Sequence, residues 1–264
     1  MIPLSPERAK VSAGGWRRAA GPLRALGLLL ATWLLLSRVL APGALPYGGD
    51  TFGHDYPIHF WAWNEVRQSG SLPLWIPGLQ NGLPTLGSFA WCPLSPTAWM
   101  MAISTPGGFR LQWWFALLIA GFGAALWGRA AGLGPAARWI AALTFALSGH
   151  LVTLISPGHL QKALALAWAP WALAAVEWGL RGSGAAAPAE GRLAGVRRAA
   201  LGGFGAGAAL GMQLLASHIQ IAWLTAALAA SRALWILAAR LLAPRPANAA
   251  PPPRPKPRCS RSAW

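Results

Sequence analysis

Residues 111–131 read LQWWFALLIAGFGAALWGRAA, an apolar stretch whose one charged residue, Arg129, lies near its end. A helix needs about 20 apolar residues to cross the hydrocarbon core of a bilayer, and this stretch is long enough. The chain is therefore predicted to be an all-α membrane protein, a multi-spanning helical bundle of about six transmembrane helices. The predicted spans are Leu23–Pro42, Leu111–Ala131, Trp139–Ser156, Leu160–Leu180, Ala199–Ser217 and Ile219–Leu242.

The composition agrees with this class, because 55% of the residues are hydrophobic and 11% are charged. A formal net charge of +16 would suggest nucleic acid in a soluble domain. Here the arginines lie in short connections and tails between apolar runs, where positive charges orient membrane helices. We expect a lipid bilayer as the surroundings and no nucleic-acid partner. The two cysteines, Cys92 and Cys259, lie far apart and form no disulfide framework.

The positive charges also predict the orientation. With the amino terminus in the cytoplasm, seventeen of the 22 Lys and Arg residues fall on the cytoplasmic side, as the positive-inside rule requires. Counting the weaker apolar run Pro93–Pro106 as a span would invert the later helices, so we interpret it as re-entrant or interfacial. The predicted parts are a basic tail over 1–22, a transmembrane domain over 23–243 with an outer loop over 43–110, and a Pro/Arg-rich tail over 244–264.

The outer loop is predicted to be structured. It is rich in Trp, Phe and Pro and is too long to be a simple connection. Residues 58–68 are expected to form a short amphipathic helix that starts behind Pro57 and ends at Gly70.

Polar groups gather on the predicted outer side, although Asp and Glu number only six in the whole chain. The stretch from Asp50 to Glu65 holds three of them beside His54 and His59. The remaining histidines also fall on this side in the predicted topology. Ionisable residues at a membrane boundary are typical of a functional site.

Several ordered motifs carry a resemblance to a known family. They are Gly49-Asp50 with His54-Asp55-Tyr56-Pro57, Gly70-x-Leu-Pro-Leu-Trp-x-Pro with Gly82-x-Pro, Leu147-Ser148-Gly149-His150, and Gly211-Met-Gln-Leu-Leu-Ala-Ser-His218-Ile-Gln220. The chain resembles the YfhO-like family of bacterial membrane proteins, which is related to the GT-C glycosyltransferases. The resemblance implies a GT-C-like amino-terminal architecture in a bacterial inner membrane and a sugar donor linked to polyprenyl phosphate.

The resemblance also implies roles for single residues. An acidic residue of the first outer loop acts as catalytic base or binds a metal in the related transferases, which points to Asp50 first and Asp55 second. A divalent cation is a possible cofactor, and its ligands are not predicted. The candidates for substrate binding on the outer side are His54, His59, His150, His159, Lys162, His218 and Gln220.

Each candidate also has a structural interpretation. The alternatives are that Asp50 stabilises a turn, that Asp55 caps the following helix, and that Lys162 extends its amine toward headgroups. For the histidines at helix ends, the alternative is a hydrogen bond to a neighbouring helix.

Two other functions remain open, a transporter subunit and a non-catalytic membrane scaffold. A YfhO-like protein would continue through further spans, whereas this chain ends in the tail over 244–264. We expect that tail to be either a solvated cytoplasmic extension or the end of a truncated reading frame, which would leave the chain inactive alone. The sugar, the acceptor and the oligomeric state are not predicted.

Overall fold

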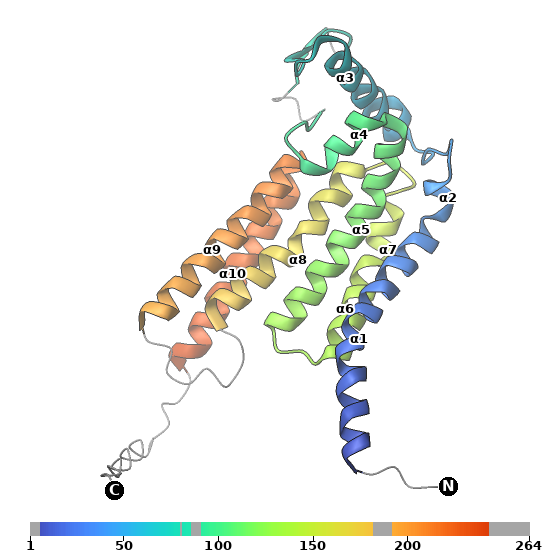
Figure 1. Ribbon diagram of the computed structural model, residues 1–264. Coiled ribbons are helices and arrows are strands. Elements are labelled where there is room, and N and C mark those ends of the chain that lie inside the picture. Colours follow the sequence, from blue (N-terminus) through green and yellow to red (C-terminus); the bar gives the residue numbers. More distant parts are fainter. Residues whose placement is uncertain (1–5, 80, 86–90, 182–191, 243–264) are drawn as a thin grey trace, which may run out of the picture.

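A computed structural model describes residues 6–79, 81–85, 91–181 and 192–242, and the predicted tail over 244–264 lies outside them. The regular secondary structure of the described part is helical apart from β1 (Trp75–Ile76) and β2 (Leu83–Pro84), which form one short antiparallel ladder. Five long helices lie side by side in Figure 1. They are α1 (Pro6–Leu35), α5 (Thr105–Ala130), α8 (Leu160–Arg181), α9 (Arg192–Leu215) and α10 (Ile219–Leu242).

Helix α8 is the centre of this arrangement, since it contacts α5, α9 and α10. Small residues permit the closest of these approaches. A Cβ atom built on Gly202 would lie 2.6 Å from the Cα atom of Gly179, so the backbones of α8 and α9 touch at this pair of glycines. Close approach through small residues is a common way for apolar helices to associate when water supplies no driving force.

Three helices are long and apolar enough to cross a membrane, namely α5, α8 and α10. This corrects the prediction of six spans, and the described helices do not show a GT-C-like architecture. Predicted span 139–156 is broken at Leu147–Ser148 into α6 (Pro135–Ala146) and α7 (Gly149–Thr153). The 12 residues of α6 rise only about 18 Å, whereas the hydrocarbon core is about 30 Å thick.

The other two predicted spans differ for separate reasons. The apolar part of α1, Ala20–Leu35, is shorter than a full span, and the chain turns at Leu36 before α2 (Ser37–Leu40). Helix α9 has sufficient length, but it begins with three arginines within seven residues and is rich in glycine, which lowers its hydropathy. The positions of these arginines predicted the orientation of the helix, but the same arginines make it less apolar than a membrane span.

The predicted outer loop folds into a compact region at one end of the long helices, which we call the cap (Figure 1). We define the cap as the described residues between 37 and 104. Its elements are α2, the π-helix η1 (Thr51–Asp55), α3 (Tyr56–Ser69), β1, β2, the 3-10 helix η2 (Pro96–Trp99) and α4 (Met100–Ile103). The predicted helix over 58–68 is confirmed as α3, which ends at Gly70 in the left-handed conformation with φ +70°. The run Pro93–Pro106 holds only single turns before α5 begins.

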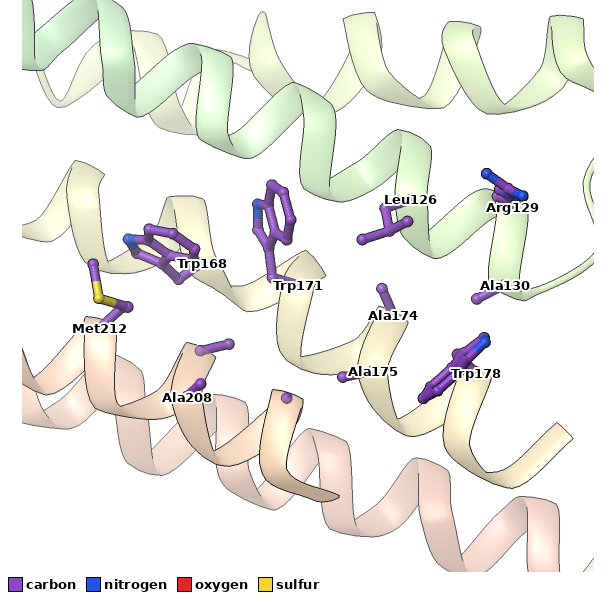
Figure 2. Close-up of a pocket in the computed structure, with 12 residues that line it drawn as sticks. Leu126, Arg129, Ala130, Trp168, Trp171, Ala174, Ala175, Trp178, Ala208 and Met212 are labelled. Carbon is purple, nitrogen blue, oxygen red and sulfur yellow. The ribbon is translucent and has the colours of Figure 1, made fainter. Parts of the chain in front are cut away.

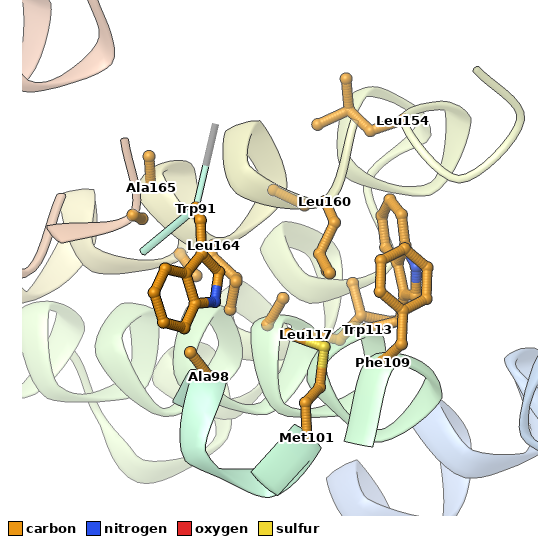
Figure 3. Packing of buried hydrophobic residues seen from close by; sticks show 14 of the residues in the cluster. Trp91, Ala98, Met101, Phe109, Trp113, Leu117, Leu154, Leu160, Leu164 and Ala165 are labelled. Carbon is orange, nitrogen blue, oxygen red and sulfur yellow. The ribbon is translucent and has the colours of Figure 1, made fainter. Parts of the chain in front are cut away.

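Buried aromatic residues attach the cap to the helices. Trp63 of α3 is fully buried and meets Trp91 edge to face, with ring centroids 5.6 Å apart. Figure 3 shows Trp91, Ala98 and Met101 of the cap facing side chains of α5 and α8 such as Phe109, Trp113 and Leu160. This burial gives the cap a defined position on the helix ends, because each large aromatic ring removes 150–250 Å² of surface from water.

Candidate functional site

The start of η1 lies directly against the connection between α7 and α8. The backbone N–H of Asp50 donates to the carbonyl oxygen of Pro157 at 3.0 Å. A Cβ atom built on Gly48 would lie 2.5 Å from the carbonyl carbon and 2.6 Å from the carbonyl oxygen of Pro157. Real Cβ atoms do not approach so closely, so only glycine permits this contact between two backbones.

A second glycine completes the contact from the opposite side. Gly158 has φ +92°, and a Cβ atom there would lie 2.5 Å from the backbone nitrogen of Thr51. Both the backbone conformation and the available space therefore require glycine at this position. Two segments that are about a hundred residues apart in the sequence are held together at this point.

This contact brings Asp50 and His159 together. The Nε2 atom of His159 lies 2.8 Å from Oδ2 of Asp50, and the two side chains are 37% and 54% exposed. The carboxylate thus keeps one oxygen and much of its surface accessible. Asp50 makes no side-chain bond that would cap η1, and its side chain faces another element instead.

Asp55 is placed differently, because its side chain is only 4% exposed. The Nδ1 atom of His54 lies 2.9 Å from Oδ1 of Asp55. With its amide oriented to donate, Gln161 of α8 reaches the same carboxylate at 2.8 and 3.1 Å. Burial raises the pKa of Asp55, and the hydrogen bond from His54 opposes that shift. The same hydrogen bond to Asp55 raises the pKa of His54.

His59 lies about one helical turn beyond Asp55, in α3, and is buried. Its Nδ1 atom has no hydrogen-bond partner among the described residues. Burial lowers the pKa of His59 to about 4, and the nearby charge of His54 acts in the same direction. His59 is therefore a neutral core residue at pH 7, which does not favour its predicted contact with substrate.

Two further candidates lie near the Asp50–His159 pair. Burial lowers the pKa of His218, and the charges of Lys162 and His159 lower it further. Near the end of α9, Gln213 donates to the carbonyl oxygen of Ala165 in α8 at 2.9 Å, which holds these two helices together on this side. Lys162 is half-buried and lies in the first turn of α8, three residues after His159.

His150 and Gln220 are exposed at the starts of α7 and α10, respectively. Within the described ranges neither side chain has a hydrogen bond or an ion pair, so nothing in the geometry joins them to Asp50. Arg67 and Arg110 stabilise the cap: Arg67 donates to the carbonyl oxygen of Met101 at 2.8 Å, and Arg110 to that of Ala44 at 3.2 Å.

In the described part of the chain, no group of three or more His, Cys, Asp or Glu side chains is arranged to hold a metal ion. Asp50 has one nitrogen neighbour, and Asp55 is surrounded by donors rather than by further acceptors. The described side chains therefore do not form a protein-only metal site.

Sequence reasoning missed the contribution of Gln161 and of both glycines. Gly48 precedes the acidic stretch and could have been noticed for its position, but only the spatial contact with Pro157 shows why it is needed. Gln161 has no sequence signal, because a glutamine at a helix start is common and its role depends on which segment lies opposite. Comparisons with protein-family models, curated proteins and solved structures found no match for this chain.

Proposed function

We propose that the chain is a YfhO-like membrane glycosyltransferase that moves a sugar from a polyprenyl-phosphate carrier to a cell-envelope acceptor at the outer face of a bacterial inner membrane. The observation that carries this proposal is the half-exposed Asp50 carboxylate, bonded to His159 beside the ends of apolar helices. A base beside the ends of membrane helices is level with the phosphate headgroup of a sugar donor whose lipid tail lies in the membrane.

The reaction requires one proton acceptor. The hydroxyl oxygen of the acceptor forms a bond to the anomeric carbon of the donor sugar, and the bond from that carbon to the phosphate oxygen breaks. The electron pair of the broken bond leaves with the phosphate, and the hydroxyl proton passes to the Asp50 carboxylate. A carboxylate within hydrogen-bond reach of the attacking group serves as a general base of this kind.

His159 and Lys162 supply the remaining roles. His159 bonds one oxygen of Asp50 and so directs the other oxygen toward the acceptor. The positive charge of Lys162 lowers the pKa of His218, and the same charge is available to the departing phosphate. Asp55, predicted as the second catalytic candidate, is the less suitable base, because His54 and Gln161 occupy its oxygens and burial keeps it from solvent.

A second candidate function is a non-catalytic scaffold, and one observation favours it. The cap exposes large apolar side chains, among them Tyr47, Leu74, Trp75 and Ile103. Such a surface suits a protein partner or the membrane interface. The scaffold requires no reactive carboxylate, so substitution of Asp50 separates the two functions.

The test uses the purified chain in vesicles with a labelled polyprenyl-phosphate sugar and bacterial envelope fractions as acceptor. We expect Asp50→Asn to lower label transfer by about 10²- to 10⁴-fold, the usual contribution of a general base. Glu65→Gln is the matched control, because this half-buried cap carboxylate has no ion-pair partner within the described residues. Equal transfer by wild type and Asp50→Asn, or no transfer by wild type, would overturn the proposal and favour the scaffold.

A further inference from the structure

A groove of about 730 Å³ lies over α8 between α5 and α9 (Figure 2). It is lined by the later parts of α5 and α8, away from the cap in Figure 1. Its floor is formed by α8, and α5 and α9 form the two sides. The lining residues are mostly apolar and none of them is Asp or Glu; they include Arg129, Trp168, Trp171, Trp178, Gly205 and Ala208.

The groove has one rigid indole wall. The Nε1 atom of Trp171 donates to the carbonyl oxygen of Ile119 at 2.8 Å, which fixes the ring against α5. Gly123 makes room for that ring, since a Cβ atom there would lie 2.5 Å from it. On the α9 side, Gly205 and Ala208 are too small to fill the space. The cavity is therefore built into the packing of the three helices.

The length of the groove suits a lipid chain. Along α8 it extends from Trp168 to Trp178, a rise of about 15 Å. This is about half of the 30 Å hydrocarbon thickness and equals the depth of one leaflet. A further membrane-spanning helix would need a groove along the whole bundle, whereas one acyl chain needs only this half.

Positive charge collects at the end of the groove that is farthest from the cap. Arg129 lines the groove there and is exposed. An adjoining hollow of about 410 Å³ shares Trp178 with the groove and is also lined by Arg197 and Arg198. An apolar slot with several arginines at its mouth is complementary to an acyl chain that carries an anionic headgroup.

We propose that this groove binds one acyl chain of an anionic glycerophospholipid, with the headgroup phosphate held at Arg129 and Arg197. The indole rings of Trp168 and Trp171 contact the chain, and Trp178 lies at headgroup depth, where an amphipathic ring is stable. The proposal is independent of glycosyl transfer, because Asp50 and His159 lie at the cap end of α8.

The test measures lipid adducts of the full-length chain by native mass spectrometry after extraction in a mild detergent. The probes are phosphatidylglycerol and phosphatidylcholine at equal concentration. We expect tighter binding of phosphatidylglycerol, and about fivefold weaker binding for each of Arg129→Gln and Arg197→Gln, which follows from about 1 kcal/mol per cation. Arg240→Gln is the matched control, because Arg240 is an exposed arginine of α10 outside the groove.

A steric variant tests the apolar part. Ala208 is exposed in the groove, so Ala208→Phe should fill it without disturbing the core and should reduce phosphatidylglycerol adducts at least tenfold. Trp223→Phe, on the exposed face of α10, should leave them unchanged. Equal binding of the two lipids, unchanged binding in Arg129→Gln, or a change of oligomeric state in Ala208→Phe with lipid binding intact would each overturn the proposal.

Discussion

A carboxylate with one or more basic partners lies near each end of α8, but the two are in opposite surroundings. Near the arginine-rich end, Glu177 is fully buried and is bonded by Arg181 at 2.6 Å and by Arg232 at 2.8 Å. At the cap end, Asp50 is 54% exposed and has one partner, His159. Glu177 has both oxygens occupied and joins α8 to α10, whereas Asp50 has an oxygen free to accept a proton. Burial and the number of partners thus distinguish the structural carboxylate Glu177 from Asp50, the carboxylate that we propose to be reactive.

Removal of the buried carboxylate of Glu177 is the strongest test of this comparison. Glu177→Leu leaves Arg232 without its carboxylate, and we expect the free energy of unfolding to fall by about 3 kcal/mol or more, as for other broken buried pairs. Unfolding in mixed micelles by a denaturing detergent measures the loss. The double variant Glu177→Leu/Arg232→Leu should recover most of it. A double variant no more stable than Glu177→Leu would show that the pair does not join α8 to α10.

Acid should act on the cap end through His59. Its folded pKa is about 4, below the ordinary value of 6.5, so its contribution to stability is complete above pH 6.5 and is lost as the pH falls from 6.5 to 4. The loss amounts to about 3 kcal/mol for a difference of this size. Thermal unfolding at pH 7 and pH 4.5 should show a smaller difference for His59→Leu than for wild type. His150→Leu, which removes an exposed histidine, serves as the control. A difference between the two pH values that is as large in His59→Leu as in wild type would contradict this prediction.

The close contact between the backbones of Gly48 and Pro157 provides another test at the cap end. Gly48→Ala places a Cβ atom against Pro157, so η1 must move away from His159. We expect a loss of about 1–3 kcal/mol, typical of overpacking, together with reduced sugar transfer. Gly49→Ala is the neighbouring control, because nothing lies within 4 Å of a Cβ atom there. Identical stability and transfer in the two variants would show that the contact with Pro157 does not require glycine at position 48.

A neutral contact between α1 and α5 provides the smallest effect. The buried Thr32 hydroxyl donates to the carbonyl oxygen of Leu28 at 2.8 Å and accepts from Nε1 of Trp114 at 3.0 Å. Thr32→Val leaves that indole N–H without a partner and should cost about 1 kcal/mol. Ser231→Ala removes an exposed hydroxyl that bonds only within α10, so its unfolding should match wild type. An unchanged Thr32→Val would show that this bond does not fasten α1.

The sequence predicted element types better than it predicted spans. The periodic pattern and the flanking Pro57 and Gly70 identified α3, because helix ends have local chemical signals. The span over 139–156 was wrong, because apolar content alone does not reveal the break at Leu147–Ser148. The Ser148 side chain accepts from the N–H of Leu151 and so begins a new helix there.

The candidate site was predictable in part. The rarity of carboxylates drew attention to Asp50 and Asp55, and the histidines on the same side suggested possible partners. Which histidine meets which carboxylate could not be predicted, since the pairing depends on Gly48 and Gly158 allowing two distant segments to touch. The neutral state of His59 also depends on its burial within the cap, a property of the fold rather than of the neighbouring residues in the sequence.

The most direct test of the central claim, that Asp50 and His159 act as one unit, is a double-mutant cycle on the sugar-transfer rate. We expect Asp50→Asn, His159→Gln and the double variant to lose transfer to nearly the same extent, because groups that act together are strongly non-additive. Protein amount and unfolding would be matched across the four forms. Losses in the single variants that multiply in the double variant would contradict the claim, since Asp50 and His159 would then act independently.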